Sequence, residues 1–348
     1  MPTDRIEGKW IDCFARVFAL CRVQPGEPVA ILSESQSRRL NVALAELALQ
    51  RLGARAFHVV VPTPPQREPV PVRSTGASDA VQRLAPVVKA LAASGMVVDC
   101  TVEGMLHAPE LPDILAGGAR LYMISNEHPD VLERTMPTPE LRAKVVEAGA
   151  LLAKASVMRV TSAAGTNLTI RVAGAPVRAS GGIADEPGRV AYWPAGLCLC
   201  FPRAGSVNGR LVMAPGDVNL TFKRYLESPV ALTIADDYVT DIAGDGVDAA
   251  LMRSYVAAWN EREAYATSHV GWGMNPAARW ESMVMYDRRD INGSELRAFA
   301  GNFLYSTGAN EHAGRFTRGH FDLPLRHCTI SLDNRVVVED GVLRGALA

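Results

Sequence analysis

The sequence predicts an α/β protein in which a doubly wound parallel sheet is followed by a mainly β (α+β) domain. Strand-like and helix-like segments alternate up to about residue 150, whereas short β-rich segments between Gly, Asn and Asp turns follow. The 348 residues also exceed the ~250–300 at which a single core usually divides. We therefore expect an α/β scaffold domain over residues 1–150 and a β-rich domain over residues 151–348.

The first half is predicted element by element from the spacing of its apolar residues. Residues 9–23 carry them at helical spacing and precede a Pro-Gly-Glu-Pro turn. Short apolar runs bounded by turns predict strands, and longer amphipathic segments predict helices. The expected strands are 29–32, 56–61, 96–100 and 120–125; the further helices are 39–52, 80–93 and 139–155. This order predicts a parallel sheet with helices on both faces.

The scaffold resembles a Rossmann-like domain in its alternation but lacks a phosphate-binding turn. No Gly-x-Gly-x-x-Gly follows the first expected strand, where Ser-Glu-Ser-Gln stands instead. A nucleotide cofactor is therefore not expected. Prolines between residues 62 and 76 predict a loop excursion after the second strand.

The second half changes character after the helix that ends near residue 155. Its apolar runs are short and separated by turn residues, which is typical of antiparallel sheets. The expected strands are 157–161, 167–172, 211–213, 230–234 and 238–242, and helices are expected at 248–262 and 293–300.

The composition argues against several classes of partner. The net charge is −1, with both signs interspersed, and no run of Lys or Arg offers a stripe for phosphates. We find neither ~18 uninterrupted apolar residues nor the pattern of a signal peptide. Six scattered cysteines without a C-x-x-C pair predict reduced core thiols. We expect a cytoplasmic protein that binds neither nucleic acid nor membranes.

A histidine and a carboxylate two residues apart are the strongest candidate for a functional site. His320 and Asp322 lie in GHFDLPL, and side chains i and i+2 of a strand leave the same face. His269, in SHVGWG, is the best third ligand because small residues around it allow close packing. Two imidazoles and one carboxylate leave coordination positions open, which suits non-haem Fe(II). For His320 and Asp322 in isolation, a structural His–Asp pair explains the pattern about equally well.

His107 is a second candidate, in the first half of the chain. It follows the third expected strand within GMLHAP, and open α/β sheets place ligands in the crevice beyond the carboxyl ends of their strands. The alternative is a surface histidine that caps the helix starting near Pro109.

Five motifs of the second half together resemble one enzyme family. In order they are IADEPGR (183–189), WPAG (193–196), SHVGWG (268–273), GNFLYSTG (301–308) and HFDLPLR (320–326). The series resembles the 2,5-dihydroxypyridine 5,6-dioxygenases of nicotinate and nicotine degradation, which are distant relatives of the M29 (aminopeptidase T-like) metallopeptidases. The resemblance includes Met105, Leu106 and His107 and so covers nearly the whole chain.

The resemblance implies an Fe(II)-dependent, extradiol-type dioxygenase that opens a dihydroxypyridine with O2 and incorporates both oxygen atoms. From 2,5-dihydroxypyridine the product would be N-formylmaleamate, in aerobic catabolism of N-heteroaromatic compounds. The family's iron ligands correspond to His269, His320 and Asp322 of the second, catalytic domain. The implied cofactor is Fe(2+), and the partners are a hydroxypyridine and O2. We expect a homo-oligomer, with a hexamer as one form.

A dioxygenase acting on an N-heterocyclic diol needs a group that accepts a hydroxyl proton, and a neutral histidine can do so. His107 is our candidate for this base, with Leu106 beside it as a substrate contact. Glu186 is a further substrate candidate, although it could instead pair with Arg189. Tyr192 is the second catalytic candidate. Relatives that act on 2,5-dihydroxypyridine carry a histidine near DEPGR at this place, and a tyrosine donates a hydrogen bond but is a poor base. This departure leaves the ring substituents open.

Further residues of the motifs could contact the ring. Tyr305, Ser306 and Thr307 offer hydroxyls that would orient ring substituents, and Trp193 or Trp272 could stack on the ring. Turn hydrogen bonds for the hydroxyls and core packing for the tryptophans are equally good explanations.

A metallo-aminopeptidase is the first alternative, because the two families are related. Peptidases of the M29 family hold two metals through two Glu and a further His, and the corresponding positions here are Leu197, His269 and Leu304. Leucine cannot bind a cation, so a single metal with three protein ligands remains. A metal-free binding protein is the last alternative, and metal analysis separates the three.

Overall fold

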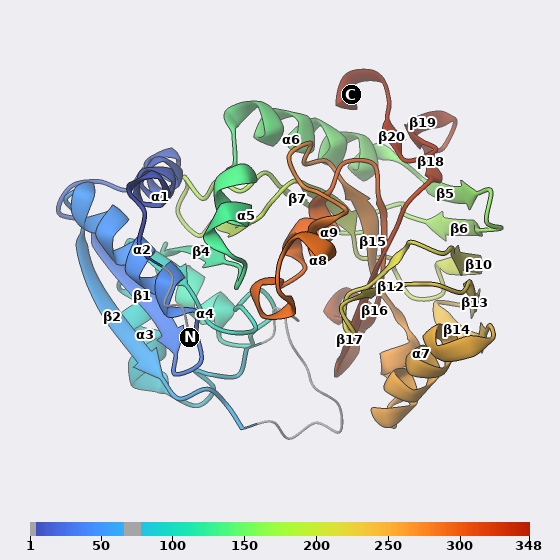
Figure 1. Cartoon of the computed structure of the whole chain (residues 1–348), viewed down its shortest axis with the longest axis horizontal. Helices are drawn as coiled ribbons and strands as arrows, with labels where there is room; N and C mark the ends of the chain where they lie inside the picture. The colour runs from blue at the N-terminus through green and yellow to red at the C-terminus, as the bar shows by residue number, and fades with distance from the viewer. Residues whose placement is uncertain (1–4, 66–77) are drawn as a thin grey trace.

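The computed structural model describes residues 5–65 and 78–348 and confirms an α/β architecture (Figure 1). A five-stranded sheet, built from four strands of the first half and β8 of the second, has the order β2-β1-β3-β4-β8, and every neighbouring pair is parallel. Its strands are β1 (Pro28–Glu34), β2 (Arg55–Val61), β3 (Met96–Asp99), β4 (Arg120–Ile124) and β8 (Val190–Trp193). The helices are α1 (Gly8–Leu20), α2 (Arg39–Arg51), α3 (Ala85–Ala92), α4 (Leu111–Ala116), α5 (Pro129–Arg134) and α6 (Pro139–Lys154).

Helices cover both faces of this sheet. Successive side chains of a strand point to opposite faces. In β1, Val29 and Ile31 pack with residues of α1 and α2, whereas Ala30 and Leu32 pack with residues of α3 and α4. Both faces are buried, as continuous apolar strands predict, and the doubly wound arrangement is confirmed.

Antiparallel sheets build the second half. The larger one has the order β14-β13-β10-β6-β5-β18-β19-β20 and the smaller one β17-β16-β15-β9-β7. The larger sheet contains β5 (Val157–Ser162), β6 (Asn167–Arg171), β10 (Val207–Met213), β13 (Val230–Ala235), β14 (Tyr238–Ala243), β18 (Cys328–Leu332), β19 (Arg335–Glu339) and β20 (Val342–Leu343). The smaller sheet contains β7 (Val177–Ser180), β9 (Leu197–Cys200), β15 (Thr267–Gly273), β16 (Phe303–Asn310) and β17 (Arg315–Leu325). The remaining elements are the pair β11 (Val218–Asn219) and β12 (Arg224–Tyr225), with α7 (Gly246–Ala258), α8 (Ser282–Met285) and α9 (Ser294–Ala298).

One large apolar core joins these two sheets. Side chains from both sheets, from α6 and from α7 contribute to it. In β9, Cys198 and Cys200 face this core, while Leu197 and Leu199 face the other way. The smaller sheet therefore has a second face, and Tyr192 of β8 packs against it. All six cysteines are buried and free, as expected.

The chain enters the two antiparallel sheets with β5, β6 and β7 and then returns to the parallel sheet with β8. Leu121 of β4 lies opposite Val190, and Ile124 lies opposite Trp193. The segment that follows leads directly to β9 in the smaller sheet. The two sheets are thus joined at this point, and a domain boundary at residue 150 remains a prediction.

Some boundaries differ from those expected. The helix expected at 80–93 begins only at Ala85, because Pro86 suits a first helical turn and the residues before it form turns. The helix expected at 248–262 ends at Ala258, shortly before Asn260 adopts a positive φ of 50°.

Two further expectations from the sequence concern the proline-rich excursion and the absence of membrane spans. Residues 66–77, which hold most of the proline-rich excursion, lie outside the described residues. Among residues 5–65 and 78–348, every helix is too short or too polar to span a lipid bilayer.

Candidate metal centre and active site

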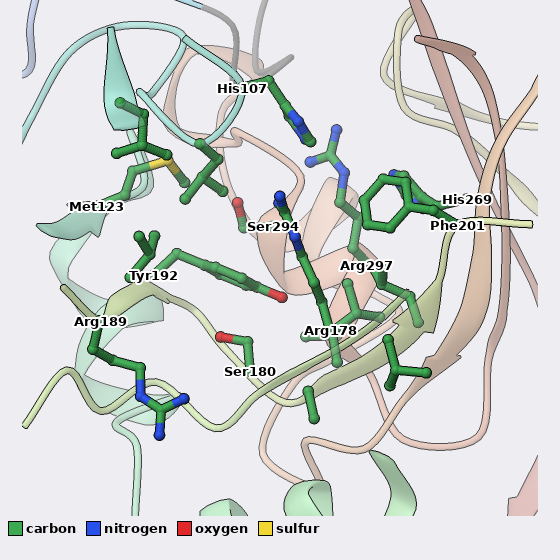
Figure 2. A pocket seen from close by; sticks show the side chains of 18 of the residues that line it. His107, Met123, Arg178, Ser180, Arg189, Tyr192, Phe201, His269, Ser294 and Arg297 are labelled. Atoms are coloured by element: carbon green, nitrogen blue, oxygen red, sulfur yellow. The ribbon is translucent and has the colours of Figure 1, made fainter. Parts of the chain in front are cut away.

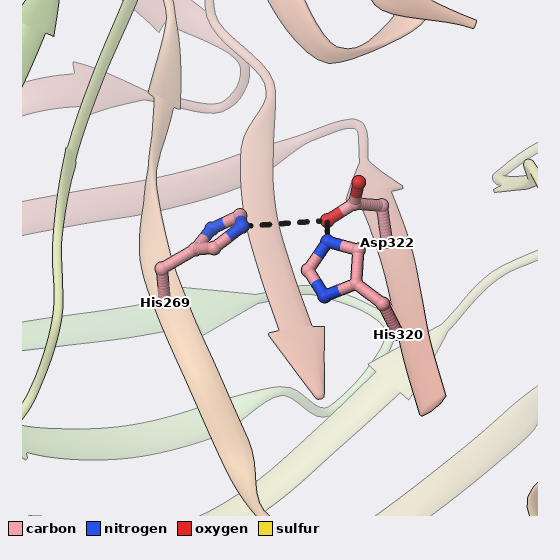
Figure 3. Close-up of side chains that lie close together, drawn as sticks. All are labelled: His269, His320 and Asp322. Carbon is pink, nitrogen blue, oxygen red and sulfur yellow. Dashed lines mark ion pairs between the residues drawn. The ribbon is translucent and has the colours of Figure 1, made fainter. Parts of the chain in front are cut away.

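Three side chains that could bind a metal ion meet on the second face of the smaller sheet (Figure 3). They are His269 of β15 and His320 and Asp322 of β17, and their donor atoms all lie within 4.8 Å of one another. The Nε2 atoms of His269 and His320 lie 3.7 and 3.3 Å from Oδ1 of Asp322. Within residues 5–65 and 78–348, this is the one such group of three potential ligands. We call it the triad.

The alternation of β17 brings two triad members to one face. Phe321 and Leu323 enter the large core, so His320 and Asp322 face the opposite way. Strand β16 lies between β15 and β17 and places Ser306 directly opposite Asp322. The shared strand face that the i, i+2 spacing of His320 and Asp322 predicted is therefore confirmed.

The SHVGWG segment forms β15 and delivers the third member. Val270 and Trp272 are fully buried in the large core, so His269 faces the triad and Trp272 does not line the cavity. A Cβ on Gly271 would lie 2.1 Å from the carbonyl oxygen of Cys198 in β9. Only glycine allows β9 and β15 to pair at this position.

Asp322 is held by two further donors. Ser306 donates a hydrogen bond to Oδ1, the oxygen that faces both histidines, and Arg297 of α9 donates to Oδ2. Burial alone would raise the pKa of Asp322, but the neighbouring His320 and Arg297 hold it well below its usual range. The carboxylate is therefore ionised and fixed in orientation.

His269 has the protonation state that a metal ligand needs. Burial lowers its pKa to about 3, although the charge of Asp322 acts in the opposite direction. The ring of Phe201 packs edge-on at 5.6 Å between ring centres. A neutral imidazole beside an ionised carboxylate fits a divalent metal ion, because ligands must be deprotonated to bind.

A cavity of about 640 Å³ opens over the triad and is bordered by both halves of the chain (Figure 2). Its lining includes the triad, His107 from the segment after β3, and Tyr192. The ring centres of His107 and His320 are 6.3 Å apart. Burial, with the charges of nearby cationic groups, lowers the pKa of His107 to about 3. His107 is therefore neutral near pH 7 and lies outside the triad.

Comparison with known proteins decides the family. Residues 9–345 match the family model described as 2,5-dihydroxypyridine 5,6-dioxygenase. The chain belongs to this family. A curated 2,5-dihydroxypyridine 5,6-dioxygenase from Pseudomonas putida KT2440 is 37% identical over 332 residues, which are 94% of each chain. The solved 2,5-dihydroxypyridine dioxygenase structure from the same strain aligns with a TM-score of 0.90, at 36% identity and over 97% of each chain.

Membership of a dioxygenase family supports oxidoreductase activity on a small molecule with O2. Wild-type AmpT from Thermus thermophilus aligns with a TM-score of 0.66 over 97% of this chain and 99% of its own, but it is only 10% identical. At that identity, the likeness shows a shared fold and nothing about the reaction.

The positions at which this family member was expected to differ from two-metal peptidases lie side by side. Leu197 of β9 and Leu304 of β16 are buried in one apolar cluster with Leu199 and Phe201. Phe201 is also the residue that packs against His269. Apolar side chains therefore border the triad on the side of Phe201.

Several predicted site residues line the cavity of this dioxygenase-family chain. Leu106, His107 and Tyr192 do so directly. Ser306 contacts Asp322 and so supports the triad, whereas its predicted role was to orient the substrate.

Other predicted substrate contacts need correction. Tyr305 and Thr307 alternate with Ser306 on β16, so their side chains face the core; the Tyr305 hydroxyl pairs with Thr267 at 2.9 Å. Trp193 is fully buried, and its Nε1 donates a hydrogen bond to the carbonyl of Thr135. Core packing, the alternative explanation for the tryptophans, is what the structure contains.

Glu186 is exposed and does not line the cavity. It forms an ion pair with Arg189 at 2.9 Å, as the alternative interpretation stated. Arg189 itself does border the cavity.

The sequence analysis missed several cavity residues. Arg178 and Ser180 lie two positions apart on β7, and their spacing would have predicted a shared face had residues 177–180 been recognised as a strand. Arg297 lies on a short helix, and no local pattern connects it to Asp322, 25 positions later. The other lining residues include Glu103, Leu111, Leu115, Met123, Val190 and Ser294.

Proposed function

We propose that this chain is an Fe(II)-dependent, extradiol-type dioxygenase that opens a dihydroxypyridine ring with O2. The observation that supports the proposal is the convergence of His269, His320 and Asp322 beneath a cavity, in a chain of this family. Two imidazoles and one ionised carboxylate form the donor set of non-haem Fe(II) oxygenases. From 2,5-dihydroxypyridine, the reaction would incorporate both oxygen atoms and yield N-formylmaleamate in the catabolism of N-heteroaromatic compounds.

An Fe(II) ion held by the triad would supply the activation of O2. Arg297 and Ser306 would keep the Asp322 carboxylate aimed at the ion, the role that outer hydrogen bonds have in metal sites. Apolar side chains of the cavity wall, such as Leu106 and Met123, would contact the ring.

Two cavity residues would interact with the polar groups of the substrate, one as a proton acceptor and one as a hydrogen-bond donor. His107 is neutral and can accept the proton of a ring hydroxyl, and an anionic ring beside it would raise its affinity for that proton. Burial raises the pKa of Tyr192 to about 12, so this phenol stays protonated and donates a hydrogen bond. In this proposal His107 is the base and Tyr192 orients the ring.

The proposal can be tested with anaerobically purified protein. We expect one iron per chain after reconstitution, and consumption of one O2 for each ring lost when hydroxylated pyridines are supplied and ring absorbance is followed. Two divalent ions with hydrolysis of peptides would favour the peptidase alternative. A protein that binds no metal ion and turns over none of the pyridines would be a binding protein.

A further inference from the structure

Arg178 brings a positive charge to the wall of the cavity. Its side chain extends from β7 toward His107 (Figure 2), and its guanidinium carbon lies 5.1 Å from the ring centre of Phe201. In the described part of the chain, no carboxylate is placed to form an ion pair with Arg178. The other two cavity arginines are paired: Arg189 with Glu186 and Arg297 with Asp322.

Two hydroxyls lie on the same side of the cavity as Arg178. Ser180 is two residues further along β7, and Tyr192 comes from β8 in the other sheet. The Ser180 hydroxyl is buried and lies next to the Tyr192 hydroxyl. Because Tyr192 stays protonated, both hydroxyls can donate to an anion beside the guanidinium.

The chemistry of this group points to a carboxylate. A guanidinium presents a planar fork of N–H donors that matches a carboxylate, and such charge-assisted pairs are stronger than neutral hydrogen bonds. Arg178 is exposed to solvent, so its charge is hydrated when the cavity is empty, and a bound carboxylate would replace part of that water with charge-assisted hydrogen bonds. The walls next to Arg178 are apolar, with Leu197 and Leu199 of the neighbouring strand β9 opposite Ser180 and Arg178.

We propose that Arg178, Ser180 and Tyr192 form a subsite for an anionic substituent, so that the substrate is a dihydroxypyridine that carries a ring carboxylate. This inference rests on the proposed function and names its substrate class. The carboxylate is retained, so ring opening still takes up one O2 and needs no other reactant. Arg178 is then a specificity-determining residue, distinct from the triad and from His107.

The test compares 2,5-dihydroxypyridine with its derivatives that carry a carboxylate at ring carbon 3, 4 or 6. The parent protein should have a higher kcat/KM for at least one carboxylate. Arg178→Gln should lower that value by about 10- to 100-fold, the effect of losing a charged hydrogen bond, and change the value for 2,5-dihydroxypyridine by less than about threefold. Arg178→Lys should recover part of the loss because the charge remains.

Two further measurements complete the design. Arg203→Gln removes the same charge from an exposed arginine that binds the carbonyl of Gly174, and it should leave the substrate preference unchanged. Titration calorimetry measures the binding of pyridine-carboxylates to the metal-free protein. The affinity should be lower in Arg178→Gln and unchanged in Arg203→Gln.

Each outcome has a distinct meaning. If no dihydroxypyridine is opened, the proposed function fails. If 2,5-dihydroxypyridine is opened but carboxylates are poorer substrates, or if Arg178→Gln lowers kcat/KM equally for both classes, the proposed function stands and the carboxylate subsite is wrong.

Discussion

The Asp322 carboxylate contacts groups of three kinds: imidazoles, a hydroxyl and a guanidinium. Each triad member would supply one of three donors to the ion. Replacing His269, His320 or Asp322 by Ala should therefore reduce iron per chain nearly to zero while the fold is retained. Metal analysis with circular dichroism measures both. His312→Ala is the matched control, because His312 is exposed and outside the triad; parental iron content in all three triad variants would contradict the assignment.

His107 is the residue whose role depends most on its protonation state. Since its pKa is lowered to about 3, it is neutral from pH 6 to 9, and its own titration should not shape kcat in that range. His107→Ala should lower kcat by ~10²- to 10⁴-fold at unchanged iron content, with partial recovery at higher pH, where the substrate hydroxyl ionises unaided. The measurement is kcat against pH at matched iron loading. Near-parental rates with an identical profile would remove His107 from the mechanism.

At the scale of the element, β16 shows how strand alternation separates function from packing. Ser306 faces Asp322, while its neighbour Tyr305 is buried in the core and pairs with Thr267. Ser306→Ala should weaken iron binding by about 10- to 100-fold, as expected for an outer hydrogen bond to a ligand. Tyr305→Phe should leave iron binding unchanged and lower stability by about 1 kcal/mol, the usual net value of one hydrogen bond.

Iron titration and chemical denaturation of these two variants measure the separate effects. Weaker iron binding in Tyr305→Phe, with no change in Ser306→Ala, would reverse the orientation of β16 described above.

At the scale of the whole molecule, Glu127 connects the first half of the chain, which contains most of the parallel sheet, to the segment that carries Arg297. It lies in the connection after β4, and its carboxylate accepts hydrogen bonds from the backbone N–H groups of Asn292, Gly293 and Ser294 at 2.7 to 3.0 Å. These residues lead into α9, which holds Arg297 against Asp322. The contact therefore connects the first half of the chain to the triad.

Glu127→Ala would leave three backbone N–H donors without this partner, and those of Gly293 and Ser294 are buried. At about 1–3 kcal/mol for each buried group, the free energy of unfolding should fall by about 3 kcal/mol or more. Denaturant unfolding measures the loss, and Glu133→Ala is the control, because Glu133 pairs with Lys9 at the surface and should cost less than about 1 kcal/mol. Equal stabilities of the two variants would show that the Glu127 contact does not hold the halves together.

Local patterns in the sequence were sufficient for the elements and for part of the site. Continuous apolar runs alternating with amphipathic segments predicted the parallel sheet, because a strand buried on both faces needs apolar side chains throughout. The i, i+2 spacing of His320 and Asp322 predicted a shared face, because side chains alternate in any strand. The choice of His269 as partner depended on the small residues around it and on the family resemblance.

The tertiary structure decided which face each strand turns toward the cavity. Alternation within GNFLYSTG places Tyr305 and Ser306 on opposite faces, but only the pairing of β16 with β15 and β17 determines which one meets Asp322. Tyr192 and Arg178 reach one cavity because β8 joins the parallel sheet and β7 joins the antiparallel one. The sequence by itself determined the periodicity of each element and the chemistry of its side chains. Strand register and sheet docking arise from contacts between residues far apart in the chain, so only the folded molecule specifies them.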